Sequence, residues 1–412
     1  MLVEVAFTIT GALIIVGFLA NYFFDRIKIP DALILMLIGI LLGPVANTYF
    51  PDSAVAQLFN PSAFLQASGF MASLAILMIM FQTGLTLDIK RVLVEVPKSF
   101  AYATIHYTLT AAITAVVAHI ILGWSWLFSW MLGFLLGGTS AAVVIPLASR
   151  IGLNKEEVDL VELESTITNV YNLVLVMALA QFVVAASTDW KAPISSILSA
   201  FSIAIVVGAV FGYLWAELFH RIERAKFSYM VTFAVTLLLY AFVEAFGGNG
   251  ALAVLVFGVV MANHKAISAV RLASVYQLHS EITFFIRVFF FVLLGVIFQP
   301  TLDIKVWALA ITISAASYFA RLYAGKKLGL EHPHEVAILL PRGLGAAVIS
   351  ALLLQMFDST VYESFAATMM QVTSITILWT NVLASILVYL SMKQRVKSVE
   401  EQAENVAAAS AA

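Results

Sequence analysis

Cysteine is absent from the 412-residue chain, which excludes disulfide bonds, thiolate metal ligands and thiol nucleophiles. Charge is scarce: 11% of the residues are Asp, Glu, Lys or Arg, whereas a soluble domain carries about 25%. The 22 basic and 24 acidic residues leave a net charge of −2 and form no basic patch that would bind nucleic acid. The sequence also lacks a phosphate-binding Gly/Lys loop, a metal-ligand cluster and a Ser/His/Asp set. These absences exclude a soluble globular protein and give no sign of an enzyme or of a bound cofactor.

Apolar residues make up 62% of the chain and fall into thirteen runs, most of them near the length of about 20 residues that crosses a bilayer. We place these segments at residues 3–24, 29–47, 65–86, 98–122, 126–149, 160–187, 195–219, 228–246, 250–264, 280–298, 304–324, 334–357 and 367–392. The sequence therefore predicts an all-α, polytopic membrane protein. The first segment lacks a basic start and a small-residue cleavage site, so we expect it to remain as a span.

Lys and Arg are distributed unevenly between the predicted loops. Eighteen of them lie in loops on one side of the predicted membrane, and only Lys191 and Lys305 lie on the other. Short cytoplasmic loops collect basic residues, so we expect a cell-membrane protein with its N-terminus outside and its C-terminus in the cytoplasm. Residues 393–412 then form a cytoplasmic tail, whose Ala-rich end we expect to be disordered.

Weak internal similarity relates segments that are seven positions apart. The segments at 65–86 and 280–298 are each followed by Leu-Asp-Ile-Lys, at residues 87–90 and 302–305. The second and ninth segments share a glycine, Gly39 and Gly258, followed by an asparagine. An offset of seven relates segments 1–6 to segments 8–13, and it inverts them because seven is odd. We therefore predict two inverted six-helix repeats with segment seven as a linker, an arrangement found in many transporters.

Four charged residues inside predicted spans stand out: Glu164, Glu244, Arg287 and Arg342. A charged side chain at membrane depth is costly, so each is a candidate functional residue. Their signs balance, and structural ion pairs that fix helix packing are the alternative explanation for each of them.

The fifth and twelfth segments, which the repeat relates to each other, both contain helix-breaking sequences. Residues 137–140 read Gly-Gly-Thr-Ser ahead of Pro146, and residues 341–345 read Pro-Arg-Gly-Leu-Gly. Matching interruptions in two halves of a transporter indicate a transport site where freed carbonyl groups need polar partners. Close helix packing through glycine explains either segment alone but not the matched pair.

The sixth segment carries a polar face, on which Ser165, Thr168, Asn169 and Asn172 recur at three- and four-residue spacing. Oxygen atoms on this face suit a hard monovalent cation. Acidic residues at 156, 157, 159, 162 and 164 precede it and predict an approach that concentrates cations, with a solvated helix start as the alternative.

At this segment the sequence resembles the cation/proton antiporter superfamily, in particular the thirteen-helix sodium/proton exchangers of archaea and bacteria. Residues 164–169, Glu-Ser-Thr-Ile-Thr-Asn, are similar to that family's Glu-Ser-x-x-Asn-Asp motif. Supporting similarities lie at residues 81–85, 137–146, 250–254, 289–295 and 341–343.

The resemblance implies a homodimer in the lipid membrane that exchanges Na⁺ or K⁺ for H⁺ through an elevator-like motion, with crossed discontinuous helices. Each protomer would have a dimerisation domain (residues 1–97 and 227–302), a linker helix (193–226) and a mobile core domain (98–192 and 303–392). Site residues for the cation or proton would be Thr139, Ser140, Ser165, Thr168 and Asn169. Glu164 and Arg342 would form a structural ion pair within the core.

The chain departs from the family motif at its last two positions, where Thr168 replaces the asparagine and Asn169 replaces the ion-binding aspartate. An amide carries neither a charge nor an exchangeable proton near pH 7. We therefore expect impaired exchange that Asn169→Asp would raise, unless coupling depends on another acid such as Glu164. A sodium-coupled organic-anion carrier, or a channel-like or non-transporting homologue, are the alternative functions.

Overall fold

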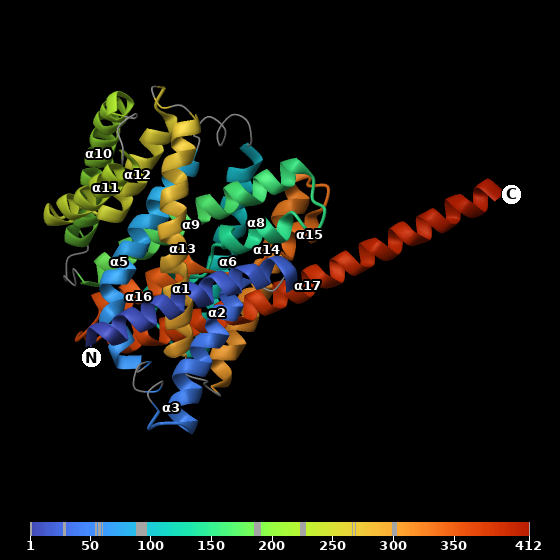
Figure 1. Ribbon diagram of the computed structural model, residues 1–412, viewed down its shortest axis with the longest axis horizontal. Helices are drawn as coiled ribbons and strands as arrows, with labels where there is room; N and C mark the ends of the chain where they lie inside the picture. The colour runs from blue at the N-terminus through green and yellow to red at the C-terminus, as the bar shows by residue number, and fades with distance from the viewer. Residues whose placement is uncertain are drawn as a thin grey trace.

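The structure is a computed structural model that describes residues 2–27, 30–53, 61–87, 97–184, 191–222, 228–265, 269–298 and 303–411, together with residues 56, 59 and 267. This part of the chain is helical, and its segments are connected by short turns and extended stretches (Figure 1). The helices run as follows: α1 (Leu2–Ile27), α2 (Asp31–Ile40), the π-helical η1 (Leu41–Val45), α3 (Ala46–Tyr49), α5 (Pro61–Thr86), α6 (Pro97–Leu122), α7 (Trp126–Leu135), α8 (Ala141–Ala148), α9 (Lys155–Val184), α10 (Lys191–Ile222), α11 (Ser228–Ala245), α12 (Gly250–Asn263), α13 (Ala269–Val296), α14 (Ile304–Leu328), α15 (Pro333–Ala337), α16 (Leu344–Met356) and α17 (Glu363–Ala411).

The thirteen predicted segments are confirmed. Eight helices of the described chain are long and apolar enough to cross a membrane, and five shorter apolar helices account for the other segments. Two segments extend by more than ten residues beyond their predicted bounds: α13 begins at Ala269 rather than near residue 280, and α17 continues to Ala411. The tail is therefore helical and projects from the body (Figure 1), because its Ala, Glu, Gln and Lys residues are good helix formers.

Close backbone contacts reveal the inverted repeat. A Cβ atom on Gly39 of α2 would overlap Gly295 of α13, and one on Gly84 of α5 would meet Gly258 of α12. An offset of seven segments converts the α2–α13 pair into the α12–α5 pair, so the repeat relates the two glycine contacts. Small residues allow helices to approach this closely in a membrane protein. The glycines shared between segments thus mark equivalent positions in the two halves.

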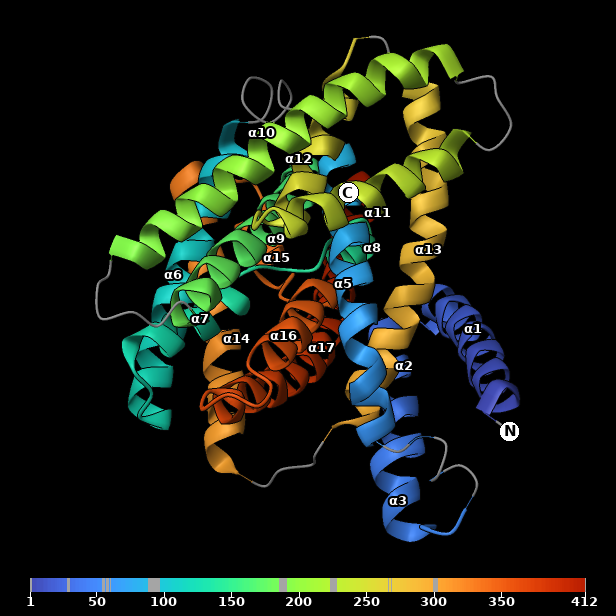
Figure 2. The same cartoon turned by 90° about the vertical axis from the view of Figure 1, so that its left-hand side faces the viewer.

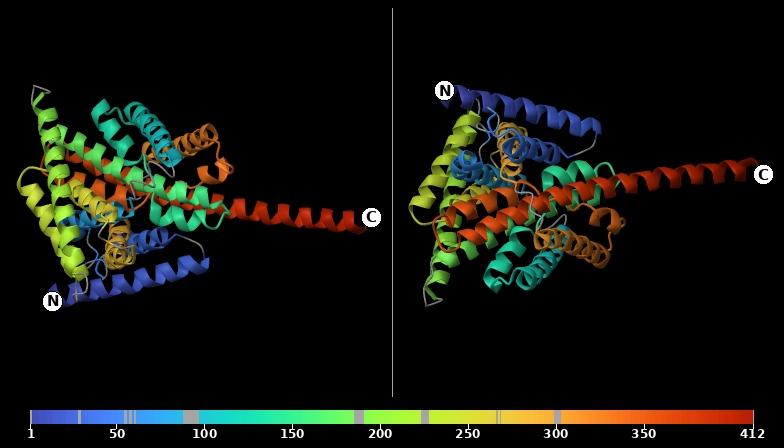
Figure 3. Two further views of the ribbon diagram at one scale, coloured as in Figure 1. Left: turned by 90° about the horizontal axis from the view of Figure 1, so that it is seen from above. Right: turned by 90° about the horizontal axis from the view of Figure 1, so that it is seen from below.

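The fifth and twelfth segments are the two broken ones, as predicted. The fifth consists of α7 and α8 with an interruption at residues 136–140, and the twelfth consists of α15 and α16 with an interruption at residues 338–343. In Figure 2, α14, α16 and α17 lie to one side of α5, whereas α13, α2 and α1 lie to the other. Views from above and below show that α17 is the element that leaves the bundle (Figure 3).

The seventh segment, α10, crosses the upper face of the molecule diagonally in Figure 2. It packs against α12, and the Asn249 amide that precedes α12 donates a hydrogen bond to the Ala200 carbonyl of α10 (3.3 Å).

Some predicted features lie outside the described residues. They include residues 88–90 of the Leu-Asp-Ile-Lys repeat and the basic loop residues Lys28, Lys90, Arg91, Arg224 and Lys226.

Candidate functional site

The two interrupted segments meet at their breaks. The Ser140 amide donates to the Pro341 carbonyl (2.9 Å), and a Cβ atom on Gly343 would overlap the Ser140 side chain. The guanidinium of Arg342 donates through Nη1 to the Gly138 carbonyl. Arg342 is almost wholly buried, and its own carbonyl accepts from the Asn381 amide of α17 (2.9 Å). Breaking a helix frees carbonyl groups that a buried site must satisfy, and Arg342 and Asn381 supply these partners.

Three of the predicted cation ligands lie together beside this crossing. The Thr139 hydroxyl lies 3.0 Å from the Ser165 hydroxyl, and the Thr139 amide donates to the Thr168 hydroxyl (3.4 Å). All three residues are buried. The break after α7 therefore turns Thr139 towards the polar face of α9, which the sequence pattern predicted.

Glu164 is the centre of a buried charged network. Its Oε2 atom accepts from Nη1 of Arg321 (2.9 Å), and its Oε1 atom lies 2.7 Å from Nε2 of His106. The Thr139 hydroxyl donates to the same Oε1 atom (2.9 Å). The side chains of Glu164, His106 and Arg321 are completely buried.

The prediction that Glu164 pairs with Arg342 is wrong. Arg342 lies at the helix break, where its guanidinium binds a freed carbonyl, whereas Arg321 on α14 reaches the carboxylate. The predicted loop charges include Arg321 with Lys326 and Lys327, but α14 continues to Leu328 and Arg321 is buried within it. The sequence analysis did not predict that His106 belongs to the network. Its signal in the sequence is a histidine in a span that also holds several Thr and Tyr residues.

Residues of α9 line one side of a cavity of about 220 Å³. We call it the inner cavity, following the predicted orientation. Its lining includes Asn169, Ser140 and Gly345 at the crossing, Glu162 and Thr166 on α9, and residues of α5 and α13. Asn169 is half-buried, and Thr139, Ser165 and Thr168 lie behind this lining. The site thus offers hydroxyl and amide oxygens at the end of an open approach.

The acidic approach is smaller than predicted. Of the five acidic residues, Glu162 lines the inner cavity. Glu157 is buried and accepts hydrogen bonds from the backbone and ring of His332 (2.7 and 2.9 Å), and Glu156 pairs with Lys98 (3.4 Å). These two acids at the start of α9 therefore contact His332 and Lys98, and neither lines the inner cavity.

Comparisons with known proteins identify the family. The family model described as sodium/hydrogen exchanger, transmembrane, matches residues 11–391. The chain belongs to this family. A solved structure of similar fold, that of the sodium proton antiporter MjNhaP1 from Methanocaldococcus jannaschii at pH 8, superposes with a TM-score of 0.77 over 95% of this chain and 99% of that one, at 19% identity. The chain is thus a multi-pass membrane protein of a family of transporters.

Curated relatives of the exchanger are more similar in sequence but longer. The K⁺/H⁺ antiporter NhaP of Alkalimonas amylolytica is 26% identical over 324 residues, which are 75% of this chain and 52% of the relative. The Na⁺/H⁺ antiporter NhaS2 of a Synechocystis strain is 22% identical over 300 residues, which are 72% and 53% of the two chains. The chain therefore spans about half the length of these relatives.

The remaining predicted charges of the exchanger have different environments. Arg287 of α13 lines the inner cavity, and its Nη1 atom lies 3.5 Å from Oδ2 of Asp31 at the start of α2. Asp31 is buried and was not singled out in the sequence. Glu244 was placed inside a span, but it is exposed near the end of α11, and its Oε1 atom accepts from the Gly250 amide (2.8 Å). It therefore caps the start of α12.

A second cavity, of about 390 Å³, lies further along the same helices. We call it the outer cavity. Three helices contribute to both cavities: Ile79, Asn169 and Gly345 line the inner one, and Ile76, Leu173 and Leu352 on the same helices line the outer one. At a rise of about 1.5 Å per residue, roughly 5 Å of α5, 6 Å of α9 and 10 Å of α16 separate the two linings. Buried apolar side chains fill this layer, including Ile76, Leu173 and Val348.

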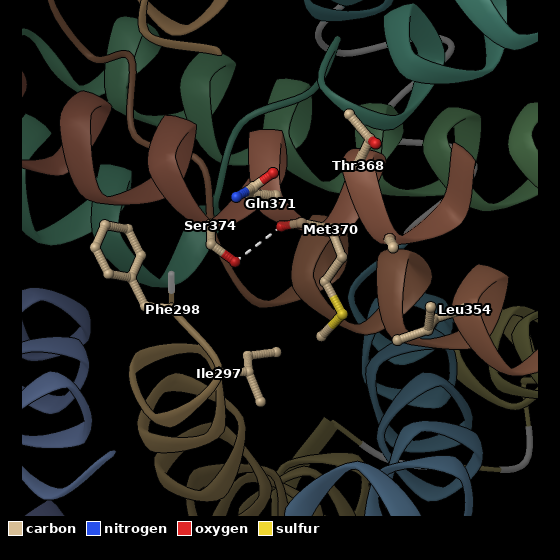
Figure 4. A pocket seen from close by; sticks show the side chains of 8 residues that line it. Ile297, Phe298, Leu354, Thr368, Met370, Gln371 and Ser374 are labelled. Atoms are coloured by element: carbon tan, nitrogen blue, oxygen red, sulfur yellow. Dashed lines mark hydrogen bonds between the residues drawn. The ribbon is translucent and has the colours of Figure 1, made fainter. Parts of the chain in front are cut away.

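A third cavity, of about 200 Å³, lies between the end of α13 and helices α16 and α17 (Figure 4). Its polar side chains are Thr368, Gln371 and Ser374, and the Ser374 hydroxyl donates to the Met370 carbonyl (2.8 Å). No charged residue lines it among the described residues. It therefore provides less favourable electrostatics for a cation than either of the other two cavities.

Proposed function

We propose that the chain exchanges Na⁺ or K⁺ for H⁺ across the membrane by alternating access. The observation that carries this proposal is the pair of cavities that approach each other along α5, α9 and α16, with Asn169 at the end of the inner one. The layer between the cavities is only one or two helical turns thick. A small relative movement of the packed helices can therefore open access to the site from one side of the membrane and close it from the other. The relatives named for K⁺/H⁺ and Na⁺/H⁺ antiport support the choice of ions.

The moving part in this proposal is the core, residues 98–192 and 303–392, which carries Thr139, Ser165 and Asn169. Residues 1–97 and 227–302 form the dimerisation part of a homodimer, and residues 193–226 connect the two. The glycine contacts between α2 and α13 and between α5 and α12 lie wholly within the dimerisation part, which suits a rigid frame.

A cation in the inner cavity would bind oxygens of Asn169 and Ser140 in the lining, and the hydroxyls of Thr139, Ser165 and Thr168 behind it. Exchange requires a group whose charge changes when a proton replaces the cation, and Asn169 has no such charge. The chain as written therefore resembles the proton-loaded state of an exchanger with an aspartate at this position, and we expect it to exchange ions poorly.

Asn169→Asp tests this function. The full chain in proteoliposomes should show at least a tenfold faster cation-dependent proton flux after the change, which corresponds to about 1.4 kcal/mol in the activation barrier. Gln82→Glu is the matched control, because it adds an acid to the inner cavity from α5 without altering α9. Strong flux from the unsubstituted chain that Glu164→Gln abolishes would instead assign coupling to Glu164.

The orientation can be tested at the two ends of α14. Lys305 and Lys326 are exposed and lie near opposite ends of this helix. In a chain without cysteine, Lys305→Cys should react with an impermeant thiol reagent from outside the cell, and Lys326→Cys only after permeabilisation. Labelling of both from one side would contradict the thirteen-span topology.

The organic-anion carrier is less well supported, because the basic residue in the inner cavity, Arg287, is paired with Asp31, and Arg342 binds a backbone carbonyl. A continuous channel is disfavoured by the apolar layer between the two cavities.

A further inference from the structure

The described lining of the outer cavity contains an acidic side chain that no basic one balances. Its charged side chain is Glu244, and no basic residue is found in its lining among the described residues. The inner cavity differs, because Glu162 and Arg287 give it both signs of charge. A cavity with a single acidic residue attracts cations, and its volume of about 390 Å³ exceeds that of several water molecules at about 30 Å³ each.

One of the two carboxylate oxygens of Glu244 accepts a hydrogen bond. Its Oε1 atom accepts the Gly250 amide, and in the described chain its Oε2 atom has no hydrogen-bond partner and neither oxygen has a basic one. Capping of α12 does not depend on it alone, because Oδ1 of Asn249 accepts from the Leu252 amide (2.9 Å). A second oxygen therefore remains for a ligand in the cavity.

Gln181 provides an independent observation on the opposite wall. Its Oε1 atom is buried without a hydrogen-bond partner in the described part of the protein, and the side chain lines the outer cavity. A buried acceptor without a partner requires an explanation. Oε1 has almost no accessible surface, so a rotation of the terminal amide is needed to turn this oxygen into the cavity, where it would meet an ion or a water molecule. The oxygens of a carboxylate and an amide are suitable ligands for a hard cation.

Gln181 and the transport site belong to one four-residue row on α9, which turns about 120° around the helix axis between Asn169 and Gln181. Asn169, Leu173, Met177 and Gln181 follow one another at four-residue intervals, and the last three line the outer cavity. The twelve residues from Asn169 to Gln181 span about 18 Å along the helix axis. One stripe of α9 thus connects the two cavities.

We propose that Glu244 and Gln181 form a second site for a monovalent cation, Na⁺ or K⁺, at the outer end of the transport route. The site holds a partly hydrated cation on the far side of the apolar layer from Asn169. It supplies a fixed negative charge where the route meets the outer solution. The assignment of the ligand rests on the proposed cation exchange, but occupancy of the site does not require transport to occur.

Cysteine protection tests occupancy directly. Met177→Cys places a single thiol in the lining, and its rate of reaction with neutral N-ethylmaleimide is measured on the purified full chain in detergent. At equal ionic strength, saturating NaCl or KCl should slow the reaction at least threefold relative to N-methylglucamine chloride. Ser73→Cys, on the α5 wall of the same cavity, is a second reporter should the first variant fail to fold.

Glu244→Gln is the decisive change, because glutamine keeps an oxygen for the Gly250 amide but removes the charge. It should abolish the protection at Met177→Cys, and Gln181→Met should weaken it. Thr86→Cys reports on the inner cavity, and its response to cations should be the same with and without the Glu244→Gln change. Equal protection with and without the Glu244 charge, or no protection by either cation at both reporters, would overturn the proposal.

Transport measurements separate this proposal from the proposed function. In Asn169→Asp proteoliposomes, Glu244→Gln should raise the KM for the cation at the outer face at least fivefold and leave the inner KM within twofold. An absence of exchange combined with charge-dependent protection would refute antiport but support the site. Normal exchange with unchanged outer KM and unchanged protection would refute the site alone.

Discussion

Two acidic positions of the family motif, five residues apart on α9, have opposite environments in this exchanger. Glu164 retains its carboxylate, which is completely buried and contacts Arg321, His106 and Thr139. Asn169 has an uncharged amide and lies half-buried in the lining of the inner cavity. The comparison teaches that two roles are separate on this helix. Glu164 belongs to a buried ion-pair network beside the crossing, whereas Asn169 lies where the proposed exchange requires a charge.

Breaking the Glu164 network should have the largest effect. Glu164→Gln or Arg321→Met alone leaves a charge buried without its partner, and we expect each to lower the free energy of unfolding by about 3–5 kcal/mol. The double variant should lose less than the sum of the two. Denaturant titration of the purified protein measures this, and additive losses would show that the two side chains are not coupled.

Loss of the histidine partner should have a smaller effect. His106→Gln removes the 2.7 Å contact with Glu164 but leaves the Arg321 pair, so we expect a loss of about 1.5–3 kcal/mol in the same titration. His119→Gln on the same helix is the control, because His119 contacts the Trp124 carbonyl away from the network. An equal effect of both substitutions would remove His106 from the network.

Substitutions at the two positions should affect different measured properties. Asn169→Asp should act on exchange, by the tenfold given above, whereas Glu164→Gln should act first on stability. Thermal unfolding and proton flux measured on the same preparations distinguish the two. The comparison fails if Asn169→Asp lowers stability as much as Glu164→Gln.

The Arg287–Asp31 pair should contribute least. The Arg287 side chain is 21% exposed and its closest atom to Asp31 is 3.5 Å away, so Arg287→Gln should cost roughly 0.2–1 kcal/mol of stability. The same denaturant titration checks this. A loss as large as that for Arg321→Met would place a second essential ion pair at the mouth of the inner cavity.

The sequence was sufficient for the helices but not for their partners. Apolar runs and loop charges predict thirteen segments because both follow from local composition. The choice between arginines does not: Arg287, Arg321 and Arg342 can each balance Glu164 in charge, and only the fold decides which side chain reaches it. Arg321 falls near the end of the predicted segment 304–324, where its charge suggests a loop residue, and only the structure shows that it is buried within α14.

Glu244 shows a second limit of sequence analysis. A charge within an apolar run indicates a buried residue, yet the turn after α11 places Glu244 at a helix end, where it caps α12. The outer cavity could not be predicted at all, since five helices that are distant in the sequence contribute to it.

The length of α10 has a mechanical consequence. Its apolar stretch, Ile194–Arg221, has 28 residues and is about 42 Å long, whereas the hydrocarbon layer is about 30 Å thick. A helix longer than the layer can match it by inclining, and a change in bilayer thickness then changes the favoured inclination. Through its packing on α12 and the bond from Asn249 to Ala200, α10 transmits this change to the wall of the outer cavity. Bilayer thickness is therefore expected to influence the shape of the outer cavity through α10 and α12.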